Sequence, residues 1–502
     1  MKRVLALLIA IAMLLGFASA EAPQEPEEMH PVQEEKPVVL QHTAVIQGKT
    51  LNYTTTTGLM EVETVGGMCE IFFMAYTLDG TEDPAKRPIT FAYNGGPGSC
   101  SEYVQMGFLA PRRIAFDRNG NVQAFPAEIE DNEYSILDLT DLVFIDPVGT
   151  GYSRPAEGTE LAEFIGYDND LRSVGDFIRL YISRYGRWGS PKYLAGESYG
   201  TTRSIGLADY LASKYEMNLN GLMLVSDISD FSIVMEGTPS DISYVLYLPT
   251  YTADAWYHQK LSEEYQKMEL EELLEDVRAF AGSDYLSALF QGKKLDETEK
   301  QEIAGRLAAY TGLDRETILA ANLRVNYQDF CRTLLSDRNL VIGRIDGRYT
   351  GPLTEGDMGG GDADPSSAAL GGIYSTAVNR YISEELGYHT DRPYITASLD
   401  VNGLWTFPDN FGMGFSQKDI VYTVMSRNRF LKVWVLGGYY DLATPFYSAE
   451  WFFDHVFINE ETEKNFQFTH YPCGHMIYME EECLAQFRKE AEEWYGRSGE
   501  GE

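Results

Sequence analysis

The sequence is poor in basic residues and in cysteine. Its 502 residues include 40 lysines and arginines against 76 aspartates and glutamates, which gives a formal net charge of −36. So acidic a chain lacks the cationic surface that binding to nucleic acid requires, and we expect no nucleic-acid partner. The five cysteines are an odd number and few for this length, which excludes a disulfide-framework protein.

Metal-binding spacings and long apolar runs are also missing. The sequence has no Cys-x-x-Cys, no His-Glu-x-x-His and no Cys/His cluster with zinc spacing, so we expect neither a metal nor a cofactor. After the N-terminus no segment approaches the length of apolar sequence that a transmembrane helix needs, so we expect no membrane span in the mature chain. The chain has only seven histidines, which leaves few candidates for chemistry that depends on an imidazole.

The N-terminus has the pattern of a secretory signal peptide. Two basic residues precede an apolar run over residues 4–17, and the small residues at 18–20 fit a cleavage site. The run is too short to span a bilayer comfortably, and polar residues follow it at once, which argues against a retained membrane anchor. We therefore expect that residues 1–20 are removed and that the protein is secreted, to the periplasm or to the extracellular space.

Changes in composition divide the rest of the chain into parts. Residues 21–40 are rich in proline and glutamate and are predicted to be a disordered lead-in. Residues 41–234 and 371–497 alternate short apolar runs with helical patterns, which predicts an α/β fold with a mostly parallel sheet between helices. Residues 235–370 carry charged amphipathic helices and a Gly-rich end, and we interpret them as a helical cap insertion. Residues 498–502 are predicted to be a disordered tail.

The strongest local motif is Gly196-Glu197-Ser198-Tyr199-Gly200. An apolar strand pattern precedes it and a helical pattern follows it. Gly-x-Ser-x-Gly in this setting is typical of a nucleophile elbow, in which the serine sits on a sharp turn between a strand and a helix. The pentapeptide alone has little specificity, so the interpretation depends on the partners of the serine.

A serine hydroxyl becomes a nucleophile only with a base and an acid that orients the base. In hydrolases with this elbow, the acid and then the histidine follow the serine along the chain. His475 lies in a Gly-containing loop after the last predicted strand, and Asp441 closes the apolar strand that begins at residue 433. We expect His455 to be structural and His470, which lies within a predicted strand, to be a packing or surface residue. Ser198, Asp441 and His475 are therefore the predicted catalytic triad.

A glycine-rich loop, Asn94-Gly95-Gly96-Pro97-Gly98, directly follows another predicted strand. Glycines allow backbone N–H groups to turn toward a developing oxyanion, and the loop has the position that supplies these donors in such hydrolases. A turn without a function and a phosphate-binding loop are the alternatives. No Gly-Lys-Ser or Gly-Lys-Thr follows the loop, which disfavours phosphate binding.

Together the motifs resemble the serine carboxypeptidase family of the α/β-hydrolase superfamily. The matching blocks are Asn-Gly-Gly-Pro-Gly at 94–98, Asp-Pro-Val-Gly-Thr-Gly-Tyr-Ser at 146–153, Gly-Glu-Ser-Tyr-Gly-Thr at 196–201, and the loops of Asp441 and His475. They spread over most of the chain in the order that the family has. The resemblance implies an α/β-hydrolase fold and a serine-type carboxypeptidase, which releases C-terminal residues from peptide or protein substrates through an acyl-enzyme.

The resemblance also implies roles for single residues. The backbone N–H groups of Gly96 and Tyr199 would form the oxyanion hole, and Asn94 and Glu197 would hold the free carboxylate of the substrate. A carboxyl group can donate a hydrogen bond to a carboxylate only while it is protonated. We therefore expect that peptidase activity favours mildly acidic pH.

Two positions depart from the family pattern. The family's second glutamate falls, by spacing, on Phe108, which predicts a thinner network around the terminal carboxylate. Ser99-Cys100-Ser101 stands where the family usually has Cys-Ser-Ser, so the usual disulfide is not assumed. Two alternatives stay open, namely an esterase or acyltransferase with the same triad and a non-catalytic secreted binding protein. Cys473, two residues before His475, either lines the site or fills the core.

Overall fold

The computed structural model describes residues 36–116, 126–234, 240–353, 364–408 and 414–496. The predicted signal peptide, the predicted tail at 498–502 and most of the predicted lead-in lie outside these ranges. Among the residues that the structure describes, no helix combines the length and the apolar character that crossing a membrane would require.

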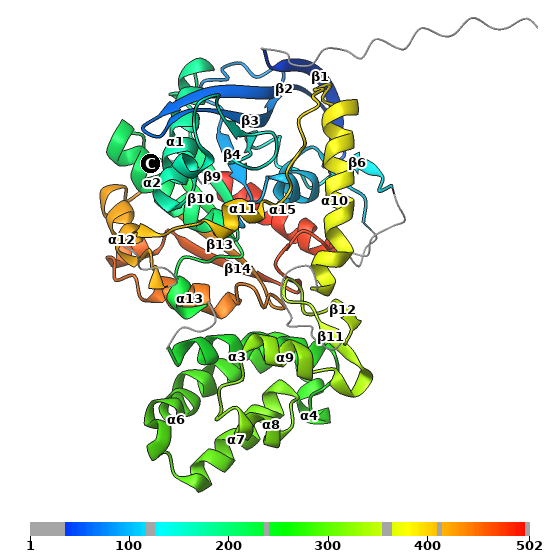
Figure 1. Cartoon of the computed structure of the whole chain (residues 1–502), viewed down its shortest axis with the longest axis vertical. Coiled ribbons are helices and arrows are strands. Elements are labelled where there is room, and N and C mark those ends of the chain that lie inside the picture. Colours follow the sequence, from blue (N-terminus) through cyan, green and yellow to red (C-terminus); the bar gives the residue numbers. More distant parts are fainter. Residues whose placement is uncertain (1–35, 117–125, 235–239, 354–363, 409–413, 497–502) are drawn as a thin grey trace, which may run out of the picture. The chain divides into compact units, whose positions relative to one another are not determined.

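A ten-stranded sheet lies at the centre of the fold (Figure 1). Nine strands follow the order β1-β2-β3-β7-β4-β9-β10-β13-β14, and β8 pairs with β3. The pairs from β1 to β7 are antiparallel, and the pairs from β7 to β14 are parallel. The strands are β1 (Val38–Ile46), β2 (Lys49–Thr64), β3 (Gly67–Leu78), β4 (Ile89–Tyr93), β7 (Asp141–Ile145), β8 (Arg154–Pro155), β9 (Lys192–Glu197), β10 (Gly221–Val225), β13 (Lys432–Gly438) and β14 (Phe466–Tyr471).

The central parallel strands are apolar almost throughout because helices cover both faces of the sheet. In β9, Leu194 packs into one hydrophobic cluster, whereas Tyr193 and Ala195 pack into the other. The first cluster includes side chains of α1 and α2, and the second includes side chains of α10 and α15. These helices are α1 (Tyr167–Arg184), α2 (Tyr199–Tyr215), α10 (Pro365–Glu384) and α15 (Glu481–Gly496).

Helices α3 to α9 lie together (Figure 1) and fall within the range for which the sequence predicts a helical insertion. Their bounds are α3 (Ile242–Tyr257), α4 (Glu263–Gln266), α5 (Leu270–Phe280), α6 (Leu286–Gln291), α7 (Glu297–Thr311), α8 (Arg315–Ala320) and α9 (Tyr327–Thr333). Polar side chains begin several of them: Asp296 and Asp314 each accept a backbone N–H of the first turn at 2.8 Å. Helix α3 packs against α13 (Phe446–Asp454), which directly follows β13 and its loop.

Shorter elements complete the chain. A two-stranded sheet of β11 and β12 follows α9, although the sequence pattern shows no strand there. The remaining strands and helices are β5 (Arg112–Ile114), β6 (Ile129–Asp131), β11 (Leu340–Ile342), β12 (Thr350–Pro352), α11 (Leu399–Gly403), α12 (Lys418–Arg427) and α14 (Glu460–Glu463). A π-helical turn spans Val104–Leu109.

Two buried carboxyl groups lie beneath the loop that follows β4. Glu102 and Asp146 are each 1% exposed. Burial raises the pKa of Asp146 to about 6. Burial, together with the charge of Asp146, raises the pKa of Glu102 well above its ordinary value. Asp146 also accepts the backbone N–H of Ser101 at 2.8 Å, which ties the two motif loops to each other.

We predict that Glu102→Gln weakens the pH dependence of stability. A carboxyl group with a raised pKa in the folded state contributes full stability below its unfolded pKa, and this stability is lost as pH rises through the folded pKa. Urea unfolding at about pH 5 and about pH 8 measures the free energy of unfolding. Between these two pH values it should fall by roughly 1–3 kcal/mol less in the variant than in the wild type. The exposed Glu133 provides the control, because Glu133→Gln should leave the change of unfolding free energy with pH as it is in the wild type. An unchanged slope in Glu102→Gln would contradict the prediction.

Candidate active site

Ser198 occupies a strained turn between β9 and α2. Its φ of 59° and ψ of −129° lie in a region that residues other than glycine rarely adopt. The turn is held from outside, because the Ser198 N–H donates to the carbonyl of Val225 at 2.9 Å. The side chain is partly exposed at the end of the strand. This strand-turn-helix arrangement is that of a nucleophile elbow.

Glycines surround Ser198 because backbone segments touch there. A Cβ atom on Gly196 would lie 2.1 Å from the carbonyl oxygen of Gly200. A Cβ atom on Gly95 would lie 2.4 Å from the amide nitrogen of Tyr199. Both distances are far below van der Waals contact, so only glycine fits either position. The second contact also places the glycine-rich loop directly beside the first turn of α2.

Asp441 and His475 form a buried hydrogen-bonded pair. The imidazole Nδ1 of His475 lies 2.7 Å from Oδ2 of Asp441, whose side chain is fully buried. Asp441 also accepts the N–H groups of Ala443 and Thr444 at 2.8 and 3.0 Å and the Thr444 hydroxyl at 2.7 Å. Burial lowers the pKa of His475, but the charge and hydrogen bond of Asp441 raise it more, so that the net shift is upward.

The loops that carry this pair are held by the turn between β11 and β12. The carbonyl of Arg344 accepts the N–H of Leu442 at 3.1 Å, next to Asp441. The following carbonyl, that of Ile345, accepts the N–H of His475 at 2.8 Å. Strand β13 itself ends at Gly438, so Asp441 lies in the turn after the strand and not at the strand end where the sequence pattern put it.

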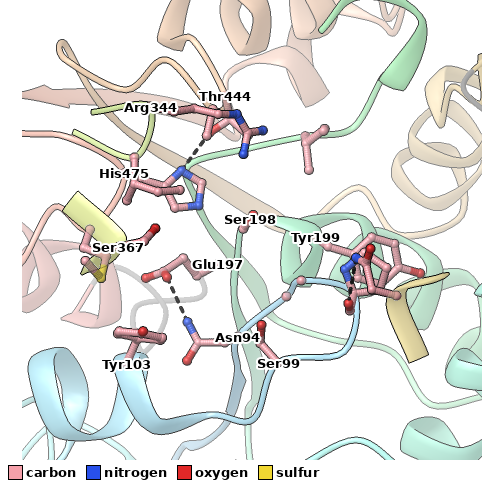
Figure 2. Close-up of a pocket in the computed structure, with 18 of the residues that line it drawn as sticks. Asn94, Ser99, Tyr103, Glu197, Ser198, Tyr199, Arg344, Ser367, Thr444 and His475 are labelled. Atoms are coloured by element: carbon pink, nitrogen blue, oxygen red, sulfur yellow. Dashed lines mark hydrogen bonds between the residues drawn. The ribbon is translucent and has the colours of Figure 1, made fainter. Parts of the chain in front are cut away.

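A cavity of about 550 Å³ opens beside Ser198 and His475. Ser198, His475, Asn94 and Glu197 all line it. Figure 2 shows the imidazole of His475 facing Ser198 from one side, with Asn94 and Glu197 on the other side of the serine. The structure thus brings together in one cavity residues that stand as far apart in the sequence as Asn94 and His475.

Asn94 and Glu197 form a second buried pair, and each is 3% exposed. The Asn94 amide donates to Oε1 of Glu197 at 2.8 Å, and its Oδ1 accepts the N–H of Val104 at 3.0 Å. The second bond fixes which way the amide points. Burial raises the pKa of Glu197 to about 7, so near neutral pH a large fraction of this group is protonated and can act as a donor.

The backbone N–H groups predicted for an oxyanion hole belong to residues at the cavity wall. Gly96 and Tyr199 both line the cavity, and the close approach of Gly95 brings their two segments together. Arg203 of α2 reinforces this contact, since its Nη1 donates to the carbonyl of Asn94 at 2.7 Å. Its Nε donates to Asp170 at the same distance, which compensates the buried charge.

Phe108 is a core residue of the π-helical turn. Its ring centroid lies 4.9 Å from that of Tyr478 and 4.3 Å from that of Phe487. An aromatic contact therefore occupies the position that the family pattern gives to a glutamate. The five cysteines, all within the described residues, are free and buried. Cys473 fills the core, where its thiol donates to the carbonyl of Ile477 at 3.6 Å.

Sequence reasoning missed much of the cavity wall. Phe231, Trp405 and Phe407 line the cavity beside Tyr199, and Arg344 lines it from the turn that holds His475. The ring centroids of Tyr199 and Trp405 are 4.9 Å apart. These residues belong to no recognisable motif and come from separate segments, so only the folded chain identifies them. Within the described ranges, no group of three or more His, Cys, Asp or Glu side chains is arranged to hold a metal ion.

The strand order, the helices on both faces and the strained serine after β9 define an α/β-hydrolase fold. The chain belongs to the serine carboxypeptidase family, whose model matches residues 46–482.

Curated relatives match over shorter stretches. Carboxypeptidase Y of Saccharomyces cerevisiae is 29% identical over 177 residues, which cover 34% of this chain and 29% of that protein. Serine carboxypeptidase-like 34 of Arabidopsis thaliana is 29% identical over 163 residues, 30% of this chain and 31% of that protein. The matched part is thus about a third of the length of these relatives.

Among solved structures, the crystal structure of KEX1(delta)p, a prohormone-processing carboxypeptidase from Saccharomyces cerevisiae, is similar over most of the chain. The match covers 88% of this chain and 91% of that chain, with a TM-score of 0.57 and 14% sequence identity. At this identity the similarity shows a shared fold.

We predict that Gly95→Ala destabilises the protein and slows reaction at Ser198. The new Cβ atom would meet the Tyr199 amide nitrogen at 2.4 Å, and a backbone atom cannot move aside as a flexible side chain can. The cost should be about 1–3 kcal/mol in urea unfolding. Fluorophosphonate labelling should be slower because the donors beside Ser198 are displaced.

Gly403→Ala is the matched control, because a Cβ atom on Gly403 meets nothing within 4 Å. A Gly95→Ala variant as stable and as reactive as this control would show that the close contact is unimportant.

Proposed function

We propose that the protein is a secreted serine-type carboxypeptidase that hydrolyses the C-terminal peptide bond of peptide or protein substrates. The observation that carries the proposal is the 2.7 Å contact of His475 with the buried Asp441, since His475 lines the same cavity as the strained Ser198. Family membership and the Asn94–Glu197 pair in the same cavity support it further.

In this proposal Ser198 attacks the scissile carbonyl while His475 takes its proton. Asp441 orients the imidazole and stabilises the imidazolium that forms, and His475 then gives the proton to the leaving amine. The N–H groups of Gly96 and Tyr199 stabilise the oxyanion of the tetrahedral intermediate. Water then hydrolyses the acyl-enzyme by the same proton transfers, with His475 as the base.

Asn94 and Glu197 hold the terminal carboxylate of the substrate. Protonated Glu197 donates one hydrogen bond to it, and the pair excludes substrates that end in an amide. The apolar surface of Phe231 and Trp405 accommodates other parts of the substrate. In the proposed domain arrangement, residues 235–370 form a cap between the two halves of the hydrolase domain.

Secretion is part of the same proposal. It is supported by the signal-peptide pattern of residues 1–20, with the periplasm and the extracellular space as the possible destinations.

A second candidate function is that of an esterase or acyltransferase. Phe108 favours it, because this buried aromatic residue cannot supply the second acidic group that the family pattern has for the terminal carboxylate. Transfer to an alcohol and hydrolysis share the acyl-enzyme, so the triad does not distinguish them. Comparing turnover of free-acid peptides, peptide amides and esters distinguishes the two functions.

We predict that a fluorophosphonate labels Ser198 in the folded protein and that Ser198→Ala abolishes both labelling and peptide hydrolysis. The loss of turnover should be at least about 10⁴-fold, because the nucleophile and base act as a unit. A peptide with a free C-terminal carboxylate should be cleaved far faster than its C-terminal amide. Equal rates would disprove carboxylate recognition, and turnover of esters alone would favour the second candidate.

We predict a bell-shaped pH profile of kcat/KM for free-acid peptides. Activity rises with pH as His475, whose pKa is raised, loses its proton and becomes a base. Activity falls again as Glu197, whose pKa burial raises to about 7, loses the proton that it donates to the substrate.

Glu197→Gln separates the two limbs, because glutamine keeps a neutral donor that does not titrate. Its profile should keep the rising limb and lose the falling limb. A falling limb that persists in this variant would exclude Glu197 as its source.

A further inference from the structure

The cavity wall includes one cation whose hydrogen-bonding capacity is unused. Arg344 is partly buried and lines the cavity. Its Nε–H is buried without a hydrogen-bond partner, and no carboxylate of the described residues forms an ion pair with its guanidinium. Its guanidinium carbon lies 5.4 Å from the centroid of the Tyr327 ring. A guanidinium has five N–H donors, and partly buried arginines normally engage them.

The carboxylates nearest to Arg344 are engaged elsewhere. Asp441 accepts hydrogen bonds from His475 and from the loop that follows it. Asp364 accepts the N–H of Ser367 at 2.9 Å and the backbone N–H of Arg344 itself. Both charges attract the guanidinium, but neither takes up its donors. The side chain is therefore a fixed positive charge with free donors at the cavity wall.

The backbone of Arg344 is held firmly. Its N–H donates to Asp364, and its carbonyl accepts the N–H of Leu442 at 3.1 Å. The side chain thus projects into the cavity wall from a defined point of the backbone. A planar fork of this kind matches the geometry of a carboxylate.

Figure 2 locates this charge relative to the reacting serine. Arg344 lies on the same side of Ser198 as His475, and Asn94 and Glu197 lie on the opposite side. On the proposed function, Asn94 and Glu197 hold the C-terminal residue of the substrate. The part of the substrate on the acyl side of the scissile bond then extends past Ser198 toward Arg344.

We propose that Arg344 forms a subsite for an acidic side chain on the acyl side of the scissile bond, so that the protein prefers peptides with glutamate or aspartate as the penultimate residue. This inference rests on the proposed carboxypeptidase function. The net charge of −36 repels acidic peptides in general, so a preference for them requires a local cation such as this one.

The experiment compares blocked peptides that differ only in the penultimate residue, with glutamate, glutamine or lysine at that position. The wild type should cleave the glutamate peptide with a kcat/KM roughly ten- to a hundredfold above that of the glutamine peptide, the range expected for a charge-assisted pair. Arg344→Gln should bring this ratio close to one, and any effect of the lost charge on His475 alters cleavage of both peptides alike and cancels in the ratio. Arg344→Lys should keep part of the ratio, and Arg344→Glu should invert it in favour of lysine.

Arg429→Gln is the matched control, because Arg429 is exposed and the same charge is removed away from the cavity. This control should keep the wild-type ratio. Thermal unfolding of each variant shows whether it is folded. If the Arg344 variants do not fold, the wild type alone is the test. A preference for the glutamate peptide over the glutamine peptide that decreases with added salt would support the subsite, and the absence of a preference would contradict it.

The possible failures are distinguishable. Cleavage of the glutamine peptide with a wild-type ratio near one would overturn the subsite and leave the proposed function standing. Absence of cleavage of every peptide together with absence of labelling at Ser198 would overturn the proposed function. If Arg344→Gln instead abolished the discrimination between free-acid and amide peptides, Arg344 would bind the terminal carboxylate, and the acyl-side subsite would be wrong.

Discussion

The backbone conformation of Ser198 is the constraint on which the rest of the site depends. A positive φ at a serine is unfavourable, and it persists only where the surroundings fix it. Here the parallel pairing of β9 with β10 fixes the strand, and the hydrogen bond from Ser198 to Val225 fixes the turn. This turn also requires glycine at position 196, and it brings the N-terminus of α2 against Gly95. The placement of Ser198, of the glycine-rich loop and of the cavity beside them thus follows from a single turn.

The buried carboxyl groups around this turn differ in their hydrogen-bond partners. Asp441 is fully buried and accepts several hydrogen bonds, including one from His475. Glu197, Glu102 and Asp146 are also buried, and burial raises the pKa of each. For Glu197 and Asp146, burial outweighs the hydrogen bonds that the carboxyl group accepts. In the proposed function, Asp441 orients the imidazole of His475, and protonated Glu197 donates a hydrogen bond to the substrate.

The sequence predicts best the features that depend on local patterns. The α/β fold was predictable because fully buried parallel strands such as β9 are continuous apolar runs, and the elbow because it needs small residues at fixed positions. Strand β2 was not predicted because its threonine-rich sequence has no clear apolar run. The cavity wall around Trp405 was not predicted because its residues come from distant segments. The roles of Ser198, Asp441 and His475, and the boundaries of the insertion, stay predictions.

The turn between β11 and β12 holds the loops of Asp441 and His475 and also lines the cavity. Ile345 holds the backbone of His475 through its carbonyl, and the preceding residue, Arg344, presents a cation to the same cavity. Because adjacent residues serve the imidazole and the cavity wall, this turn cannot move as a lid without disturbing the Asp441 loop, to which Arg344 also binds. Substitutions that reshape this segment should thus affect turnover along with substrate preference. Variation in specificity is easier to accommodate at Trp405 and Phe231, whose side chains line the cavity from segments that do not carry His475 or Asp441.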